Sequence, residues 1–231
     1  MPIKLNSNIV ANEGGVIGKA FQGLIKILKY PIRGIWIKNI TGQENLPQCG
    51  PYIVAANHQS NFDAVSLIAA IRDRMFFLTG EKFYRSIFWR NVMKYTGQIK
   101  VERTKKDKTD VFELGKKVLD SGYVLALFPQ GTRDRNDEIK KTFTGVSKFH
   151  LAHKVPVVPI GIKGSFQMFP PGARIPKFKK IVEVHIGKPM EFKECYDKEP
   201  NDQVYRDITN KIMIEIAKLS DKKYVPETEV N

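Results

Sequence analysis

Residues 52–71 read YIVAANHQSNFDAVSLIAAI, and two periodicities meet inside this stretch. Residues 52–56 form an apolar run of strand length, whereas apolar residues recur at helical spacing between positions 62 and 71. The segment between them is polar and contains His58 and Asp63. We therefore predict a buried strand that turns into a helix, which is the repeating unit of an α/β domain.

The histidine and the carboxylate of this turn invite two interpretations. On one helix, five residues would separate His58 and Asp63 by about 140°. If His58 lies in the turn and Asp63 in the first helical turn, their side chains converge, and the carboxylate then leaves one imidazole nitrogen free to accept a proton. The same segment also fits a capping box, with Ser60 as the N-cap and Asp63 covering free backbone amides. The residues of this stretch alone leave both interpretations open.

Outward from this stretch, strand and helix patterns alternate along the chain. Six strands are predicted, at residues 52–56, 75–79, 98–102, 123–128, 156–162 and 180–187. Five helices are predicted, at residues 62–71, 82–95, 108–120, 144–153 and 203–219. This alternation predicts the α/β class, a three-layer αβα domain with a largely parallel or mixed sheet. The residues that follow Leu219 are expected to fray.

The amino-terminal region carries an amphipathic helical period from about Gly15 to Trp36. One face is apolar, and the other is a polar stripe formed by Lys19, Gln22, Lys26, Lys29 and Arg33. The continuous stripe argues against a bilayer span, which needs about 20 mostly apolar residues. Such a helix either lies in a membrane interface or covers the protein's own core, and the positive charge favours the membrane. We therefore divide the chain into an amphipathic helical segment, residues 1–40, and one α/β domain, residues 41–231.

Composition narrows the class of partner. The 231 residues suffice for one α/β core, and the formal net charge of +14 favours an anionic partner such as nucleic acid, an anionic lipid surface or a phosphorylated substrate. Cys49 and Cys195 lack metal-ligand spacing and are interpreted as free thiols. The first fifteen residues lack the apolar core of a cleavable signal peptide, which predicts a cytoplasmic setting.

A second candidate ligand site lies in the loop at residues 127–133, LFPQGTR, which directly follows an apolar strand. Gly131 allows close approach of the backbone to a ligand, Thr132 offers a hydroxyl, and Arg133 offers a bidentate fork for phosphate. Open α/β sheets commonly bind ligands at such carboxyl ends of strands. Two further segments, residues 97–103 and 154–160, have the character of a charged strand end and a proline-bracketed scaffold strand.

Taken in order, these four segments resemble the motifs of the glycerophospholipid acyltransferase family, in particular the 1-acyl-sn-glycerol-3-phosphate acyltransferases. Residues 57–63 meet the family's Asn-His-x-x-x-x-Asp motif. Residues 97–103 are similar to the second motif, with Glu102 where aspartate is usual, and residues 128–133 to the third, with Gln130 in place of glutamate. Residues 155–159 match the fourth, a proline-bracketed valine strand. The resemblance favours the catalytic interpretation of the first motif.

The resemblance implies acyl transfer from a thioester, carried by acyl carrier protein or coenzyme A, to the sn-2 hydroxyl of 1-acyl-sn-glycerol 3-phosphate (lysophosphatidic acid). The product would be phosphatidic acid in phospholipid biosynthesis, made without a cofactor or a metal. His58 would act as the general base, and Asp63 would fix its tautomer and stabilise the imidazolium.

The acceptor's phosphate requires cations, and Arg103 and Arg133 are the candidates, with Lys105 as a third. Gln130, Gly131 and Thr132 complete the expected substrate-binding set. Backbone amides between Asn57 and Ser60, or at Gly131, are the candidate oxyanion donors. Because acceptor and product both reside in membranes, the resemblance also implies docking at the membrane surface, as a peripheral or monotopic protein on its cytoplasmic face.

Three rival functions differ in their sequence support. Another acceptor, such as glycerol 3-phosphate or a lyso-ornithine lipid, would use the same machinery. A nucleic-acid-binding protein is suggested by charge alone, since no binding module or stacking platform is recognisable, and we expect no nucleic-acid partner. A metal hydrolase built on His58 and Asp63 would need further ligands, and the sequence shows no cluster at ligand spacing.

Overall fold

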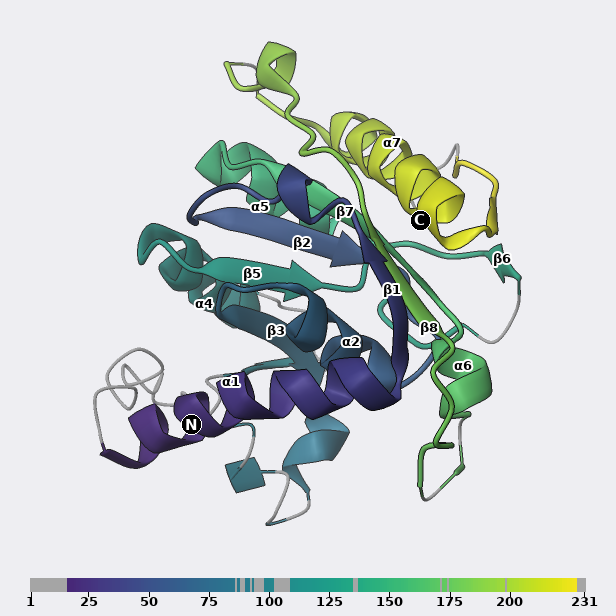
Figure 1. Ribbon diagram of the computed structural model, residues 1–231. Helices are drawn as coiled ribbons and strands as arrows, with labels where there is room; N and C mark the ends of the chain where they lie inside the picture. Colours follow the sequence, from purple (N-terminus) through teal and green to yellow (C-terminus); the bar gives the residue numbers. More distant parts are fainter. Residues whose placement is uncertain are drawn as a thin grey trace.

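The computed structural model describes residues 16–85, 87, 90, 91, 93, 98–101, 109–134, 137–170, 172, 173, 175–197 and 199–227. A seven-stranded sheet in the order β1-β8-β7-β2-β5-β3-β4 forms its centre (Figure 1). Its strands are β1 (Ile37–Thr41), β2 (Tyr52–Ala56), β3 (Met75–Gly80), β4 (Ile99–Val101), β5 (Val124–Leu127), β7 (Val157–Lys163) and β8 (Val182–Ile186). A second, two-stranded sheet pairs β6 (Glu138–Ile139) with β9 (Lys223–Tyr224).

The sheet is mixed, as predicted. Neighbouring strands are parallel everywhere except between β7 and β8. Strands β1 and β8 consequently run against the other five, so their amino-terminal ends lie at the same edge as the carboxyl ends of β2, β5 and β7. This edge therefore collects the residues that follow β2 and β5 and those that precede β1 and β8.

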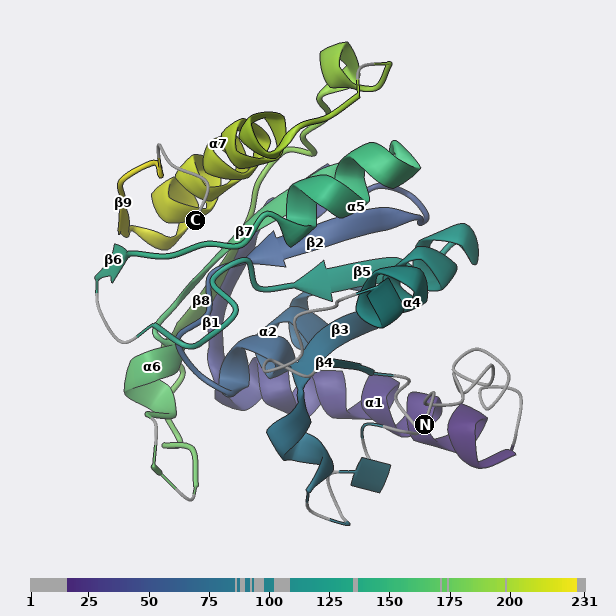
Figure 2. The same cartoon turned by 180° about the vertical axis from the view of Figure 1, so that it is seen from behind.

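Helices cover both faces of the sheet, which confirms the three-layer prediction (Figures 1 and 2). Helices α1 (Val16–Ile35) and α2 (Phe62–Ala70) cover one face, and α4 (Thr109–Asp120), α5 (Gly145–His153) and α7 (Asp202–Ser220) cover the other. Two hydrophobic cores result because successive side chains of a strand point to opposite faces. In β2, Tyr52 and Val54 enter the core beside α2, whereas Ile53 and Ala55 enter the core beside α5 and α7.

The elements missed by sequence reasoning are short. They are β1, β6, β9, the one-turn helix α6 (Ser165–Met168), and the 3₁₀ turns η2 (Gln43–Asn45) and η4 (Lys193–Cys195). The start of the predicted helix 82–95 is a 3₁₀ turn, η3 (Glu81–Tyr84). Strand β1 has no clear alternating pattern in the sequence, because only Ile37 of its residues is buried. It also follows α1 after a single residue, so no turn signal separates the two elements. The predicted helix 82–95 and strand 98–102 extend in part outside the described residues. Every other predicted element is present, within two residues at each boundary.

The basic stripe of α1 turns partly toward the protein, contrary to a simple amphipathic arrangement. Lys29 Nζ donates to the carbonyl of Ile71 (2.6 Å), and Arg33 Nε donates to that of Ala69 (2.6 Å). These carbonyls lie at the carboxyl end of α2, where they lack intrahelical partners and carry the negative end of the helix dipole. Burial, together with the neighbouring Arg33, lowers the pKa of Lys29. Two of the predicted surface cations therefore join α1 to α2.

The apolar face of α1 is correspondingly open. A core-covering helix would bury Leu24 and Leu28, yet they are 48% and 44% exposed. Ile27, Tyr30 and Ile35 are exposed as well, and Ile32 packs against the core. None of the described helices is both long and apolar enough to cross a bilayer.

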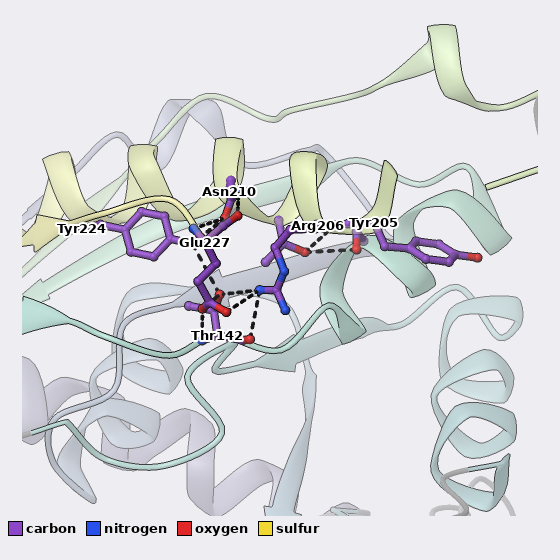
Figure 3. A network of polar contacts seen from close by, with 8 residues as sticks. Thr142, Tyr205, Arg206, Asn210, Tyr224 and Glu227 are labelled. Atoms are coloured by element: carbon purple, nitrogen blue, oxygen red, sulfur yellow. Dashed lines mark hydrogen bonds and ion pairs between the residues drawn. The ribbon is translucent and has the colours of Figure 1, made fainter. Parts of the chain in front are cut away.

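The expectation that the chain frays after Leu219 is wrong for residues 221–227. Strand β9 pairs with β6, and Glu227 returns to the buried Arg206 of α7 (Figure 3). Arg206 Nη1 lies 3.2 Å from Glu227 Oε2 and donates to the Thr142 carbonyl at 3.1 Å. Glu227 Oε1 in turn accepts from the Thr142 amide and hydroxyl, at 2.7 and 2.9 Å. Sequence reasoning missed this network because its partners are 85 residues apart.

Replacing Glu227 by alanine should lower the free energy of unfolding by about 1.5–3 kcal/mol, since it removes charged hydrogen bonds from the nearly buried Arg206. Urea denaturation measures this change. The exposed Glu194→Ala makes the same charge change and should lie within about 0.5 kcal/mol of wild type. Equal stability of the two variants would mean that the carboxyl-terminal residues do not brace the fold.

Candidate active site

The turn between β2 and α2, residues 57–61, lies at the sheet edge formed by the carboxyl ends of β2, β5 and β7. Asn57 fixes its start. The Asn57 side chain is fully buried and forms a fork with β7, donating from Nδ2 to the Ile162 carbonyl (2.9 Å) and accepting at Oδ1 from the Ile162 amide (2.7 Å). The side chain thus extends the β2–β7 ladder after the β2 backbone has turned away.

His58 and Asp63 converge, as the turn-to-helix arrangement predicts. His58 Nδ1 lies 2.8 Å from Asp63 Oδ2, and the same oxygen accepts from the backbone amides of Gln59 and Ser60, both at 2.7 Å. Asp63 is fully buried. One carboxylate oxygen therefore orients the imidazole and satisfies the amides at the start of α2 at once. The catalytic and capping interpretations are not alternatives, because both contacts exist together.

The cap itself differs in detail from the prediction. The residue that precedes α2 is Asn61 rather than Ser60, and its side chain makes no cap hydrogen bond. Ser60 Oγ instead accepts from the Phe62 amide (3.1 Å) and donates to the Phe169 carbonyl (2.7 Å). Ser60 thereby joins the turn to the segment that follows α6.

The imidazole of His58 is held on its face as well as at its edge. It stacks on Phe128, with ring centroids 4.1 Å apart and planes at 15°. The His58 side chain remains 19% exposed. In the neutral form of the ring, Nδ1 carries the hydrogen, because a carboxylate oxygen can only accept, and Nε2 presents a lone pair. The arrangement can accept a proton from a group that reaches Nε2.

The loop after β5 contacts the backbone of the same histidine. Gln130 Oε1 accepts from the His58 amide at 2.7 Å, and the His58 carbonyl accepts from the Asp134 amide at 2.8 Å. Gly131 adopts a left-handed conformation (φ 63°), which disfavours any residue with a side chain. A Cβ at this position would also meet the Phe143 ring at 2.6 Å. The two segments that sequence reasoning singled out therefore form one site.

The substrate-binding set is partly placed by the structure. Gln130 is buried, Gly131 and Thr132 are exposed, and Arg133 is half-buried beside them. Arg103 and Lys105 lie outside the described residues, as do Gly97 and Glu102 of the same motif. Arg133 is accordingly the candidate phosphate cation for which the structure gives a position.

The expected oxyanion donors are engaged elsewhere. The amides of His58, Gln59 and Ser60 donate to side-chain oxygens of Gln130 and Asp63, and the Gly131 amide donates to the Phe128 carbonyl at 2.9 Å. These four N–H groups hold the turn and the loop in shape. An oxyanion would have to compete with these acceptors for any of the four amides.

Sequence reasoning gave no role to two residues that the structure makes essential to the geometry, Asn57 and Phe128. Both belong to the quoted motifs, so their place in the sequence was visible, but their contacts were not. The buried fork of Asn57 and the ring stack of Phe128 depend on strands β5 and β7, which are distant in sequence.

The buried His150 has a structural role. His150 Nδ1 lies 2.7 Å from the Val155 carbonyl, and its Nε2 accepts from the Phe192 amide at 3.2 Å. Burial lowers the pKa of His150, which agrees with a neutral ring that uses both nitrogens inside the fold. Within the described part of the chain, no three histidine, cysteine, aspartate or glutamate side chains gather as metal ligands, and both cysteines are free.

Gln130 provides a test of the hydrogen bond that the loop makes to His58. Gln130→Glu keeps an acceptor for the His58 amide, and we expect its turnover within about tenfold of wild type. Gln130→Leu is similar in size but leaves that buried amide unpaired, which should cost about 1–3 kcal/mol of stability. Steady-state kinetics and thermal melts measure the two effects. A gain in turnover of about a hundredfold in Gln130→Glu would show instead that a carboxylate is required for proton transfer.

Comparisons with known proteins identify the family of this chain. The family model described as Acyltransferase matches residues 38–163, a span that contains both the His58 turn and the 128–134 loop. A 1-acyl-sn-glycerol-3-phosphate acyltransferase of Haemophilus influenzae is 24% identical over 154 residues, which are 63% of this chain and 59% of that protein. The one of Saccharomyces cerevisiae is 27% identical over 161 residues, 68% of this chain and 51% of that protein.

Among solved structures, the 1-acyl-sn-glycerophosphate (LPA) acyltransferase PlsC from Thermotoga maritima has the same fold. The TM-score is 0.67 at 19% identity, over 93% of this chain and 91% of that one. The chain spans between half and three-fifths of the length of the two curated relatives. Since the family model covers more than half of the sequence and includes the site, the chain belongs to the acyltransferase family.

Proposed function

We propose that the protein transfers an acyl chain from an acyl thioester to the sn-2 hydroxyl of 1-acyl-sn-glycerol 3-phosphate, giving phosphatidic acid. One observation carries this proposal: the 2.8 Å contact between His58 Nδ1 and the buried Asp63, which leaves Nε2 as the proton acceptor. The two curated relatives compared above are both named 1-acyl-sn-glycerol-3-phosphate acyltransferases, which supports the choice of acceptor. The donor is acyl carrier protein or coenzyme A carrying the acyl chain.

The reaction needs a base and no protein nucleophile, because the thioester is already activated. As the acceptor oxygen attacks the thioester carbonyl carbon, its proton passes to His58 Nε2 and the carbonyl electrons move to oxygen. Asp63 stabilises the imidazolium through Nδ1–H. The intermediate then collapses, the carbon–sulfur bond breaks, and the thiolate takes the proton from Nε2. His58 is neutral again at the end of the cycle.

The acceptor's phosphate is assigned to the loop after β5. Arg133 would supply a guanidinium fork. The amide of the next residue, Asp134, donates to the His58 carbonyl, which supports a cation close to the base. Gln130, Gly131 and Thr132 complete this side of the proposed pocket. Arg103 and Lys105 would approach from the strand end after β4.

Arg133→Ala should lower kcat/KM for lysophosphatidic acid by about 10–100-fold, because it removes a charged hydrogen bond of about 1.5–3 kcal/mol. Lys140→Ala removes one charge from an exposed position directly after β6 and is the matched control, expected within about threefold. The comparison is repeated with an acceptor that lacks phosphate. An equal loss for both acceptors would contradict the assignment of Arg133 to the phosphate.

The membrane is the proposed setting. Residues 1–40 would form an interfacial segment in which the open apolar face of α1 enters the headgroup region. The exposure of Leu24, Ile27, Leu28, Tyr30 and Ile35 supports this, as does the net charge of +14, which suits an anionic cytoplasmic leaflet. The protein would then be peripheral or monotopic.

The experiment that tests the function supplies purified protein with an acceptor panel: lysophosphatidic acid, glycerol 3-phosphate and a lyso-ornithine lipid. Each is paired with acyl carrier protein and coenzyme A thioesters, and products are followed by mass spectrometry. We expect phosphatidic acid from lysophosphatidic acid and little product from the other acceptors. A preference for either of the other acceptors would change the proposed acceptor but leave the proposed acyl-transfer mechanism in place. Absence of acyl transfer from every pairing would reject the proposal.

A further inference from the structure

A short segment just before β8, residues 175–180, has an unusual surface composition. It reads IPKFKK, and we call it the lysine loop. Ile175 and Phe178 are 69% and 74% exposed, and Lys177, Lys179 and Lys180 are exposed beside them. Neighbouring large apolar side chains are seldom left open to water without a partner. The alternation of apolar and cationic side chains therefore indicates a binding partner that offers both apolar groups and negative charge.

The lysine loop is held in place by α1. Trp36, which follows the last residue of α1, stacks on Phe178 with ring centroids 5.7 Å apart, and its Nε1–H donates to the Lys177 carbonyl at 2.9 Å. The Lys177 amide donates to the Met168 carbonyl at 2.9 Å. The exposed side chains are thus presented on a fixed backbone.

The same contacts link the lysine loop to the active site. Trp36 meets the edge of Phe62, the residue beside Asp63, at 5.6 Å between centroids. Ser60 of the catalytic turn donates to the Phe169 carbonyl in the segment that leads into the loop. A surface bound by the lysine loop would therefore lie next to the His58 turn.

Exposed apolar side chains concentrate on one side of the molecule. In both views, the segment after β3 and the loop before β8 extend on the same side as α1 (Figures 1 and 2). Of the eleven exposed large apolar residues in the described part of the chain, eight lie on these three segments, the exceptions being Phe143, Ile214 and Val225. The eight are Leu24, Ile27, Leu28, Tyr30, Ile35, Ile87, Ile175 and Phe178.

We infer that the lysine loop is a second membrane-docking element, which inserts Ile175 and Phe178 into the interface of an anionic bilayer while its lysines bind lipid phosphates. Lysine stems lie along apolar surface and keep their ammonium groups at the headgroup level. An acidic protein would also attract the lysines, but it would not account for the eight apolar residues on the same side. The inference rests on the proposed function in one respect: the site whose opening the loop would bring to the bilayer takes a lipid acceptor.

Vesicle flotation without substrate tests the inference on the full chain. The vesicles contain equal parts of phosphatidylcholine and phosphatidylglycerol. Lys177→Gln/Lys179→Gln/Lys180→Gln should bind them about a hundredfold more weakly, from about 1 kcal/mol per lysine and 1.4 kcal/mol per factor of ten. Ile175→Ser/Phe178→Ser should bind about tenfold or more weakly, from the lost apolar burial.

Matched variants on other surfaces serve as controls. Ile214→Ser removes an exposed apolar side chain from α7, and Lys117→Gln/Lys188→Gln/Lys218→Gln removes three exposed charges elsewhere. Both controls should lose less than about threefold in vesicle binding. Loop variants that bind like wild type, or controls that lose as much as the loop variants, would overturn the inference.

A second measurement does not depend on loss of binding. With Cys49→Ser and Cys195→Ala in place, a cysteine at position 175 or at position 214 carries a fluorescent label, and brominated lipids serve as the quencher. We expect quenching of the label at 175 and none at 214. Equal quenching at the two positions would overturn the inference.

The outcome is separable from that of the proposed function. Wild-type protein that binds vesicles through the lysine loop but transfers no acyl chain would reject the function and leave the docking surface in place. A lysine variant that binds vesicles normally, yet loses turnover only when acyl carrier protein delivers the chain, would identify a protein-docking surface and overturn the inference.

Discussion

Replacing His58 by alanine is expected to lower turnover by about 10²–10⁴-fold while leaving the fold intact. The physical reason is the loss of Nε2, the nitrogen left to take the acceptor's proton once Nδ1 is bound to Asp63. The imidazole is partly exposed and stacks on Phe128 at the surface of the site, so its removal opens little buried volume. Steady-state kinetics with lysophosphatidic acid and an acyl thioester, beside a thermal melt, measure both parts of the expectation.

His185→Ala is the matched control. His185 is half-buried at the β1–β8 side of the sheet, where it contacts Thr41 and Glu183, and it has no place in the proposed site. Its loss should change turnover less than about tenfold. A folded His58→Ala protein with near-normal turnover would remove the general base from the mechanism. If added imidazole restores part of the lost rate, the missing function is proton transfer.

Replacing Asp63 by asparagine should reduce both turnover and stability. Turnover is expected to fall by about 10³–10⁴-fold, because an amide neither stabilises the imidazolium nor enforces the tautomer. Oδ2 accepts three hydrogen bonds, and Oδ1 is buried without a partner among the described residues, so an amide nitrogen at either position loses bonds or finds no acceptor. Stability should fall by about 1–3 kcal/mol, a decrease of about 2–12 °C in Tm.

Ser66→Ala separates the two effects. The Ser66 hydroxyl donates to the Phe62 carbonyl within α2 and does not contact Asp63, so its loss loosens the same helix by about 1 kcal/mol. Its turnover should stay within about tenfold of wild type. Should Ser66→Ala lose as much turnover as Asp63→Asn, helix loosening would account for the rate, and Asp63 would be chiefly structural.

The pattern of residues determined most of the fold. Apolar runs and helical periods placed the long elements because burial of one face or one stripe is a local, repeating demand on the sequence. The break between residues 56 and 62 placed His58 and Asp63 at a strand-to-helix turn, where they do meet. The apolar strand before it and the residues Gly131 to Arg133 marked the loop at 128–133 as a ligand site, and the structure brings the Gln130 side chain and the Phe128 ring to His58.

Elements with weak local signals depended on tertiary structure. Strands β1, β6 and β9 are short and become strands only because a distant partner supplies their hydrogen bonds. The residues after Leu219 look polar and unsupported in sequence. They are ordered because a buried charge is costly without a partner. The chain folds back so that the Glu227 carboxylate pairs with the buried Arg206, 21 residues earlier.

The same division holds within the site and on the surface. The sequence by itself predicted which residues carry the chemistry, because an imidazole, a carboxylate and a guanidinium at motif spacing can be recognised by residue type. Only the tertiary structure decided that Asp63 caps α2 and orients His58 with one oxygen, that the amides expected to bind an oxyanion already have acceptors, and that Lys29 and Arg33 face α2. A hydrogen bond forms between whichever groups folding brings within about 3 Å of each other. The periodicity of a sequence shows which residues share a face, but not which distant residues come into contact.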